Sequence, residues 1–471
     1  MNMLLERIES EGLAHYSYLI GNEGEAIVID PRRDCDIYVD MAQRRDYRIT
    51  HILETHRNED YVIGSLELAA RTGAEVWHAD RDWPYQYGRP VQDQQTWHLG
   101  RLVLEAIHAP GHTPGMMAYL LHDYGGAPWV LFSGDALFAG SVGRVDLLGK
   151  GQTEEMASLL YHSLFHKLLP LGDGVILCPA HGAGSACGAA IAQRPWTTIG
   201  LEKALNPLLQ IRDRLDFIAH AAQDLERPPY FQRMEAVNVQ GPPIIGPLPA
   251  AEPLSPAAFA AQIEAGALVL DTRMDLGFNA AHVPGALSIW LGGLPSFAGW
   301  FLPYDRPLLL VTEEADPTPA MRDLLRMDYV QIAGHLAGGM LAWHMAGRES
   351  DSVAMVTVQE LCRRLDAGEA PWLLDVRSPE ELERQGRIPG AHSIHITQLP
   401  AHLVEVPREQ PVYIFCGSGL RSTIAASLLQ REGWDNETVV LGGFAGWQSC
   451  THPIEGAQAP VESLEATPNM L

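Results

Sequence analysis

Short apolar runs alternate with turn-rich and helical segments over residues 1 to about 190. The runs are rich in β-branched and aromatic residues and are bounded by turn residues, a pattern that predicts β-strands. They read HYSYLIG, EAIVID, THILET, AEVWHA, RLVLEAIHA, WVLFSGD and GVILCPA. A polar side chain with ligating atoms follows each of the last three runs. Because loops at strand ends carry the chemistry of such folds, we expect the functional site there.

The alternation of apolar runs and turns gives way to a different pattern from about residue 192 to residue 253. The segment LEKALNPLLQIRDRLDFIAHAAQDL is amphipathic with a helical period, and the segment RPPYFQRMEAVNVQGPPIIGPLPAAEPLSP is dense in proline. These features predict helices that pack on the first domain, followed by a proline-rich tether.

Two similar segments fill the C-terminal half of the chain. The first contains LVLDTRMDLGFNAAHVPGALSIW and ends AGHLAGGMLAWHMAG, and the second contains WLLDVRSPEELERQGRIPGAHSIHI and ends VVLGGFAGWQ. Both run strand, Asp-x-Arg, helix, Pro-Gly-Ala turn, strand, helix, strand, Gly-Gly and Trp, which indicates an internal repeat. Strands that alternate with helices at this spacing predict parallel sheets covered on both faces.

The chain length of 471 residues indicates about three domains. We place them at residues 1–252, 253–350 and 351–471, with an α/β fold class throughout. The first includes the helices and the tether from about residue 192.

Charge and composition narrow the possible partners. A formal net charge of -25 argues against nucleic acid or an anionic membrane as a partner. The N-terminal segment carries early acidic residues and no long apolar run, so we expect neither a signal peptide nor a membrane span. The cysteines show no paired spacing, which is typical of reduced thiols in a cytoplasmic protein.

Ordered motifs in the first domain carry the candidate metal ligands. They are THRNED (55–60), APGHTPG (109–115), FSGDALF (132–138) and CPAHG (178–182). Through these motifs residues 1–190 resemble the metallo-β-lactamase superfamily, and the resemblance implies an αββα sandwich. The superfamily motif T-H-x-H-x-D-H is matched at Thr55, His56 and Asp60. Asn58 and Tyr61 stand where that motif carries histidines.

These departures bear on the number of metal ions. Superfamily hydrolases such as glyoxalase II use two metal ions. With Asn58 and Tyr61 at these positions, each of the two metal ions would lose one histidine ligand. Persulfide dioxygenases share the fold and bind a single ferrous ion, and their ligand positions match His56, His112 and Asp135. The resemblance therefore implies one Fe(II) per chain, held by two histidines and one carboxylate as in non-haem Fe(II) oxygenases. A decayed, metal-free scaffold is the alternative.

Further residues of the first domain are candidates for the substrate pocket. Arg144 in GSVGRVD matches an arginine that persulfide dioxygenases use near the thiol, and a guanidinium suits a carboxylate or persulfide anion; a salt bridge is the alternative. His181 matches a second-metal position, and without that metal we expect it either in the substrate pocket or in contact with a metal ligand. Cys187 is expected to rim the site, as a persulfide carrier or as a small buried thiol. Asp60 is expected to orient a ligand or a turn. Glutathione-using dioxygenases carry a tyrosine after the matching histidine, whereas residues 182–184 read GAG. This departure argues against glutathione as the preferred carrier and leaves the identity of the thiol open.

The loop CGSGLR follows a predicted buried strand of the second repeat. Cys416 and Arg421 bound this loop, and the backbone amides of Gly417, Ser418 and Gly419 are expected to converge on the cysteine sulfur at a helix N-terminus. Such surroundings lower the pKa of a thiol and stabilise a cysteine persulfide. Through this loop, Asp-x-Arg and IPGA, the repeats resemble rhodanese (sulfurtransferase) domains. Related phosphatases use a loop that is one residue longer, so the short loop favours sulfur transfer.

The first repeat carries TEEADPT (312–318) where the second carries its cysteine loop. Without a cysteine, and with acidic side chains that repel an anionic sulfur donor, this repeat is expected to be catalytically silent. Structural roles are expected for two Asp–Arg pairs and two cysteines: Asp271 with Arg273, Asp375 with Arg377, Cys362 and Cys450.

The order dioxygenase, silent rhodanese, active rhodanese resembles the fused persulfide dioxygenase–sulfurtransferases of sulfide detoxification (the CstB type). The resemblance implies that a persulfide is oxidised with O₂ to sulfite, and that Cys416 transfers sulfane sulfur to the sulfite to give thiosulfate. The expected partners are small-molecule persulfides, O₂, sulfite and thiosulfate, and we expect a homo-oligomer, either a dimer or a tetramer. Two alternatives remain open: a rhodanese with a non-catalytic scaffold, and a metal-dependent thioester hydrolase fused to rhodanese domains.

Overall fold

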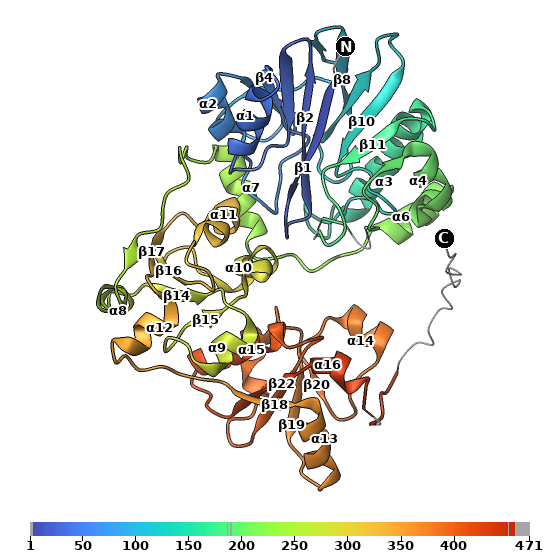
Figure 1. The fold of residues 1–471 in the computed structure, drawn as a ribbon. Coiled ribbons are helices and arrows are strands. Elements are labelled where there is room, and N and C mark those ends of the chain that lie inside the picture. The colour runs from blue at the N-terminus through green and yellow to red at the C-terminus, as the bar shows by residue number, and fades with distance from the viewer. Residues whose placement is uncertain (1–2, 186, 189–190, 451, 457–471) are drawn as a thin grey trace, which may run out of the picture. The chain divides into compact units, whose positions relative to one another are not determined.

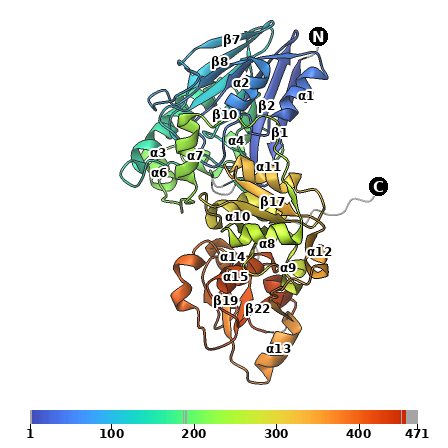
Figure 2. The same cartoon turned by 90° about the vertical axis from the view of Figure 1, so that its left-hand side faces the viewer.

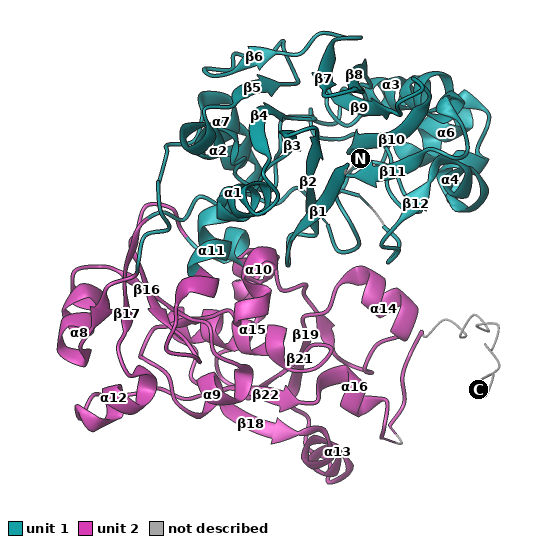
Figure 3. Cartoon of the chain, turned by 45° about the horizontal axis from the view of Figure 1, so that its top comes forward, with its two compact units in different colours: residues 1–250, 298–302, 321–330 teal, residues 251–297, 303–320, 331–471 magenta. Residues whose placement is uncertain are grey.

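The chain divides into two compact units in a computed structural model that describes residues 3–185, 187–188, 191–450 and 452–456. Unit 1 comprises residues 1–250, 298–302 and 321–330, and unit 2 comprises residues 251–297, 303–320 and 331–471 (Figure 3). Within the described part of the chain, no helix has the length and apolar character needed to cross a bilayer.

Two mixed β-sheets form the centre of unit 1. Their strands are β1 (Leu4–Ser10), β2 (His15–Asn22), β3 (Glu25–Ile29), β4 (Arg48–Leu53), β5 (Glu75–His78), β6 (Arg89–Pro90), β7 (Thr96–Leu99), β8 (Leu102–His108), β9 (Met117–His122), β10 (Pro128–Gly134), β11 (Ile176–Pro179) and β12 (Thr197–Thr198). One sheet has the order β1-β2-β3-β4-β5-β6 and the other β12-β11-β10-β9-β8-β7. Every run that the sequence marks as a strand forms one.

Helices cover the outer faces of both sheets (Figure 1). They are α1 (Asp36–Gln43), α2 (Ser65–Thr72), α3 (Thr153–His162), α4 (Ile199–Leu205), α5 (Pro207–Gln210), α6 (Arg214–Ala221) and α7 (Phe231–Gln240), and a π-helical turn (Ser163–Leu168) and a 3-10 turn (Leu169–Leu171) follow α3. Side chains alternate along each strand, so Ile20 of β2 packs between the sheets while Leu19 packs toward α1 and α2. On the second sheet, Leu131 packs against Leu160 of α3. The result is an αββα sandwich.

The proline-rich segment after residue 226 is more ordered than the predicted tether. It contains the helix α7, whose Phe231 and Met234 are buried. Asn238 of this helix donates hydrogen bonds to the carbonyls of Asn58 (2.8 Å) and Tyr61 (2.8 Å). The helix therefore supports the loop that follows β4. The sequence favours a helix here because three apolar or amide side chains between Pro229 and Gly241 recur at helical spacing.

Unit 2 contains two sheets in which every described strand pair is parallel. The strands are β13 (Pro253–Leu254), β14 (Leu268–Asp271), β15 (Leu287–Ser288), β16 (Leu308–Val311), β17 (Ile332–Leu336), β18 (Ala354–Thr357), β19 (Trp372–Asp375), β20 (His392–Ser393), β21 (Val412–Phe415) and β22 (Glu437–Leu441). The two sheets have the orders β13-β17-β16-β14-β15 and β18-β22-β21-β19-β20, so the internal repeat is also a topological repeat.

Helices lie against both faces of these sheets (Figures 1 and 2). They are α8 (Pro256–Glu264), α9 (Asp275–Ala280), α12 (Gly339–Met345), α13 (Val358–Asp366), α14 (Pro379–Gln385), α15 (Leu420–Arg431) and α16 (Gly443–Trp447), with 3-10 turns at Leu291–Gly293, Leu399–Ala401 and Leu403–Glu405. The same part of the chain contains α10 (Leu294–Phe301) and α11 (Thr318–Arg326), of which residues 298–301 and 321–326 belong to unit 1. In the last sheet, Phe415 and Val440 pack with Leu361 of α13 and Trp447 of α16 on one face, while α15 contacts the other. This arrangement confirms the predicted α/β class with parallel sheets.

The Asp-x-Arg pairs form as the sequence predicts. Arg377 Nη2 lies 2.6 Å from Asp375 Oδ2, and Arg273 Nη2 lies 2.6 Å from Asp271 Oδ2. Each guanidinium also donates to a carbonyl that follows the next helix, from Arg377 to Gly386 (3.0 Å) and from Arg273 to Ala281 (2.8 Å). The pairs thus tie a strand end to the turn after a helix.

Candidate metal centre and sulfur-transfer loop

His56 lies on the loop after β4 and is held by its neighbour. Thr55 Oγ1 donates to Asp30 Oδ2 (2.7 Å) and lies 2.8 Å from His56 Nδ1. Because the Thr55 hydroxyl hydrogen is committed to Asp30, its oxygen accepts from Nδ1–H, which leaves the lone pair of the imidazole on Nε2. His56 is fully buried, and its Nε2 has no hydrogen-bond partner among the described residues.

His112 lies between β8 and β9 and has the same tautomer. Its Nδ1–H donates to the carbonyl of Arg144 (2.9 Å), so the neutral ring carries its lone pair on Nε2. This Nε2 lies 3.4 Å from Asp135 Oδ2, and His56 Nε2 lies 3.7 Å from the same oxygen. Asp135 directly follows β10. The structure therefore brings together His56, His112 and Asp135, the residues predicted to hold the iron.

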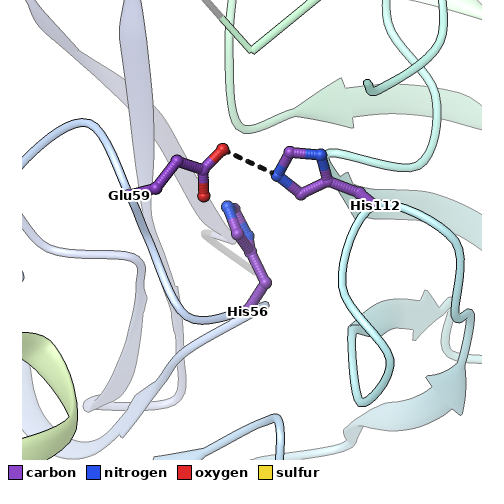
Figure 4. Close-up of side chains that lie close together, drawn as sticks. All are labelled: His56, Glu59 and His112. Carbon is purple, nitrogen blue, oxygen red and sulfur yellow. Dashed lines mark ion pairs between the residues drawn. The ribbon is translucent and has the colours of Figure 1, made fainter. Parts of the chain in front are cut away.

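Glu59 is a member of this cluster that sequence reasoning missed (Figure 4). Its Oε1 lies 3.0 Å from His112 Nε2, and the side chain is fully buried. His56, Glu59 and His112 offer ligand atoms that all lie within 4.8 Å of one another. The signal was present in the sequence, because Glu59 follows His56 by three residues, but the superfamily motif leaves that position unspecified.

Charges within the cluster shift its pKa values strongly. Burial alone lowers the pKa of His112, but the carboxylates of Glu59 and Asp135 outweigh it and raise the pKa to about 9. Burial alone raises the pKa of Glu59 and of Asp135, and the neighbouring imidazoles outweigh it in both cases, so both pKa values lie below the ordinary range. Without a metal, a protonated His112 therefore faces the carboxylates of Glu59 and Asp135.

His181 follows β11 and lies between two carboxylates. Its Nδ1 is 2.8 Å from Asp135 Oδ1, and its Nε2 is 2.9 Å from Asp60 Oδ2. Burial opposes protonation, but Asp135 and Asp60 raise the pKa of His181 well above its ordinary value. Tyr61 occupies the place of a superfamily histidine and packs its ring against His15, with 4.0 Å between the ring centroids. His181 thus contacts the candidate ligand Asp135 directly.

Cys187 lies at the same centre rather than at its rim. Its thiol is fully buried and donates to Glu59 Oε1 (3.3 Å). Asp60, His181 and Cys187 form a further group whose ligand atoms lie within 4.8 Å of one another. Burial, together with Asp60 and Glu59, raises the pKa of Cys187 well above its ordinary value, which keeps the thiol protonated and weakly nucleophilic without a metal.

Arg144 supports the centre through its backbone, and its side chain is engaged elsewhere. The guanidinium pairs with both oxygens of Asp146 at 2.7 Å, and it donates to the carbonyls of Leu225 (3.1 Å) and Glu226 (3.4 Å). Arg144 also lines a cavity of about 270 Å³ together with Gly143, which adjoins His112. Its predicted contact with substrate stays a prediction.

The loop after β21 places Cys416 at the start of α15. The Gly419 amide donates to Cys416 Sγ (3.0 Å), and the cysteine is buried. Arg421 forms a bidentate pair with Glu381 through contacts of 2.5 and 2.7 Å. Burial opposes ionisation of Glu381, but hydrogen bonds from Arg421 and Ser378 outweigh it and lower the pKa to about 2. The predicted loop residues Gly417, Ser418 and Gly419 lie between Cys416 and the helix.

The Gly442–Gly443 turn at the start of α16 packs against this loop. The amides of Phe444 and Ala445 donate to the carbonyls of Cys416 (2.8 Å) and Gly417 (3.1 Å). A Cβ at Gly443 would lie 2.3 Å from the Cys416 carbonyl oxygen, and Gly443 has φ of 48°. This position therefore requires glycine. In the first repeat the matching loop, residues 312–318, has no cysteine, and its Glu313 and Glu314 are exposed.

Comparisons with known proteins identify the families to which the domains of this chain are similar. Residues 11–181 match the model of the metallo-beta-lactamase superfamily, and residues 255–346 and 357–450 each match the rhodanese-like domain. The hydroxyacylglutathione hydrolase GloC of Haemophilus influenzae is 28% identical over 214 residues, which cover 41% of this chain and 91% of that protein. The mitochondrial persulfide dioxygenase ETHE1 of Bos taurus is 28% identical over 222 residues, which cover 44% of this chain and 77% of that protein.

One solved structure extends beyond the first domain. A metallo-beta-lactamase from Staphylococcus aureus subsp. aureus COL is 29% identical with a TM-score of 0.64, and the match covers 72% of this chain and 99% of that chain. The chain therefore contains a metallo-β-lactamase superfamily domain followed by two rhodanese-like domains, a content consistent with a fused dioxygenase–rhodanese protein.

Proposed function

We propose that this chain is a persulfide dioxygenase with sulfurtransferase activity, which converts the sulfane sulfur of a small-molecule persulfide to sulfite and then to thiosulfate. The observation that carries the proposal is the convergence of His56 Nε2 and His112 Nε2 on the carboxylate of Asp135, in a chain that also carries the Cys416 loop. The named persulfide dioxygenases among its relatives support the same activity.

The donor atoms at the centre fit a divalent metal ion. Both Nε2 atoms are buried. His56 Nε2 has no hydrogen-bond partner among the described residues, and such an atom costs free energy unless something binds it. His56, His112 and Asp135 would hold one ion per chain. Fe(II) bound by two histidines and one carboxylate supplies a redox centre with positions open to a thiol and to O₂.

The surrounding residues orient these donors. Thr55 fixes the ring of His56, the Arg144 carbonyl fixes the ring of His112, and His181 holds Asp135 Oδ1. Partners of this kind set the tautomer and direction of a ligand, and their loss typically weakens metal binding about 10- to 100-fold.

The first reaction balances as RSSH + O₂ + H₂O → RSH + SO₃²⁻ + 2H⁺. The sulfane sulfur gives four electrons to O₂, and the S–S bond to the carrier thiol breaks.

The second reaction, RSSH + SO₃²⁻ → RSH + S₂O₃²⁻, is assigned to Cys416. Its thiolate attacks the terminal sulfur of a persulfide, and the carrier leaves as a thiolate that takes the proton. The cysteine persulfide then gives this sulfur to sulfite, which forms the S–S bond of thiosulfate and restores the Cys416 thiolate. The Gly419 amide and the N-terminus of α15 stabilise the anionic sulfur. Both steps in one chain raise the effective concentration of sulfite at the second site.

A thioester hydrolase is the second candidate, and one observation favours it. Asp60, His181 and Cys187 form a second group of converging donors beside the first, and two metal ions held side by side are the usual equipment for hydrolysis. Relatives named hydroxyacylglutathione hydrolase agree with this alternative.

The proposed setting is cytoplasmic. All six cysteines are described and all are free thiols, which suits a reducing compartment. The expected dimer or tetramer stays a prediction.

Metal analysis of protein purified without oxygen, combined with an oxygen electrode, tests the proposal. We expect one iron per chain and uptake of one O₂ for each persulfide oxidised. Two zinc ions per chain, with thioester hydrolysis and no O₂ uptake on persulfide, would establish the hydrolase instead. Sulfur transfer without any bound metal would leave a rhodanese with a scaffold domain.

A further inference from the structure

We propose that Glu59 is a fourth protein ligand, so that the metal centre has two histidines and two carboxylates. The proposal deepens the proposed function, because it concerns the same metal site. Figure 4 shows His56, Glu59 and His112 pointing toward one another from two different loops. Their ligand atoms all lie within 4.8 Å of one another.

The hydrogen bonding of Glu59 leaves it available to a metal. Cys187 Sγ donates to Oε1 at 3.3 Å. Oε2 is buried and has no hydrogen-bond partner in the described part of the chain, and the same is true of His56 Nε2. Two unsatisfied buried polar atoms in one cluster are costly unless a group that binds both is present. A cation does so, because carboxylate oxygens and unprotonated imidazole nitrogens are both electron-pair donors.

The charge at the centre also suits a cation once the histidines bind it in their neutral form. Glu59, Asp60 and Asp135 are buried acidic side chains within one cluster of contacts. Two buried arginines close to this cluster are already paired. Arg57, on the same loop as Glu59, pairs with Glu235 (2.7 Å), and Arg144, whose carbonyl binds His112, pairs with Asp146 (2.7 Å). Buried charges are paired or coordinate metals, and a divalent ion among these donors neutralises charge that the arginines do not.

The local sequence explains why Glu59 is needed. Asn58 stands where the superfamily motif carries its second histidine, and its Nδ2 donates to the backbone carbonyl of His56 (3.3 Å). Asn58 therefore offers no metal ligand at this position, and the next residue supplies one instead. Glu59 thus replaces the missing imidazole with a carboxylate, one position later in the chain.

Reconstitution of the metal-free full chain with Co(II) tests this assignment. Co(II) is the probe because its visible absorption depends on the number and type of its ligands. We expect Glu59→Gln to weaken Co(II) binding by more than about 100-fold, beyond the effect of a residue that only orients a ligand, and to change the Co(II) spectrum. Glu59→Asp keeps the charge but shortens the side chain, and should weaken binding less than Glu59→Gln.

Glu54→Gln is the matched control. Glu54 is a buried carboxylate on the same loop, but the Tyr87 hydroxyl donates to it (2.9 Å) and burial raises its pKa to about 8, so an amide is a close substitute. We expect binding within about threefold of the original protein, since Glu54 lies outside the cluster. A Glu59→Gln protein that is folded and binds Co(II) with unchanged affinity, or with an unchanged spectrum, would overturn the assignment.

The experiments distinguish a failure of the Glu59 assignment from a failure of the proposed function. If the unmodified chain oxidises persulfide with one iron while Glu59→Gln binds metal normally, only the Glu59 assignment is wrong. If Co(II) binding depends on Glu59 but the iron-loaded chain takes up no O₂ with persulfide, the ligand is right and the dioxygenase is wrong.

Discussion

Each histidine of the candidate centre has its tautomer set by one neighbour. Thr55 and Asp30 act on His56, and the backbone carbonyl of Arg144 acts on His112. Both rings therefore present an unprotonated Nε2 when neutral, which is the form that binds a metal. The high pKa of His112 in the metal-free cluster means that a metal must displace a proton there, so metal binding releases protons.

His112→Ala removes one of the proposed ligands and is expected to abolish activity. Iron content should fall below detection and O₂ uptake on persulfide should drop by at least about 100-fold, because loss of a residue that only orients a ligand already costs about 10- to 100-fold. Iron analysis and the oxygen electrode measure both quantities. His98→Ala, an exposed histidine on β7, should leave them unchanged. Uptake at the original rate in His112→Ala would show that the ligand set is wrong.

Arg421→Ala is expected to weaken sulfur transfer without stopping O₂ uptake. The change removes a charge near the anionic sulfur and leaves Glu381 without its bidentate partner. A hydrogen bond to a charged group contributes about 1.5–3 kcal/mol, which corresponds to about a 10- to 100-fold loss in thiosulfate-to-cyanide transfer. Arg384→Ala on the same helix as Glu381 is exposed and serves as the control. Equal rates for the two variants would contradict this role for Arg421.

At the residue scale, the sequence predicts which side chains belong to the site when a motif specifies their positions. It does not predict those that only the packing of the fold brings to the site. His56, His112 and Asp135 follow predicted strands, so their convergence is foreseeable. Glu59 occupies an unspecified motif position, and only the fold shows that it points inward. Arg144 shows the converse, since the sequence does not reveal that Asp146 binds its guanidinium.

At the scale of elements, the Cys416 loop depends on the turn before α16. The Cys416 carbonyl accepts from the Phe444 amide, and this contact is possible only because Gly443 has no Cβ. The sequence marks Gly-Gly as part of the repeat, but it does not show that the turn closes over the cysteine.

Gly443→Ala is therefore expected to destabilise the last domain and to reduce sulfur transfer. Gly368→Ala is the control, because Gly368 also has a positive φ (89°) but has no atom within 4 Å of an added Cβ. The control should cost about 1–2 kcal/mol from backbone strain alone, and Gly443→Ala about 1–3 kcal/mol more from the clash. Urea unfolding followed by tryptophan fluorescence measures the difference. Equal unfolding midpoints would refute the role of the turn.

Helix α15 shows why sequence patterns fail at some elements. Its Ser422, Thr423 and Ser427 are buried, although a polar face normally indicates exposure. Asn279 of the first repeat donates to Thr423 Oγ1 (3.1 Å), and the Ser288 amide donates to Ser427 Oγ (3.1 Å). The first repeat thus satisfies polar groups on the helix that follows the Cys416 loop, a contact between the two repeats that no local pattern encodes.

At the scale of the whole molecule, the proposed chemistry is divided between two compact units. The candidate metal ligands all belong to unit 1, whereas Cys416 and Arg421 belong to unit 2. Each unit has its own hydrophobic core. The two activities are therefore expected to be separable by single substitutions, since neither site uses residues of the other.

The products formed by Cys416→Ser test the central claim most directly. The unmodified chain should consume two persulfides for each O₂ and release thiosulfate. Cys416→Ser lacks the nucleophile of the second step, while the metal centre is intact, so it should consume one persulfide for each O₂ and release sulfite. Oxygen uptake combined with chromatographic analysis of sulfite and thiosulfate gives both ratios. Thiosulfate formation at the original rate in Cys416→Ser would contradict the coupled mechanism and would direct attention to Cys187.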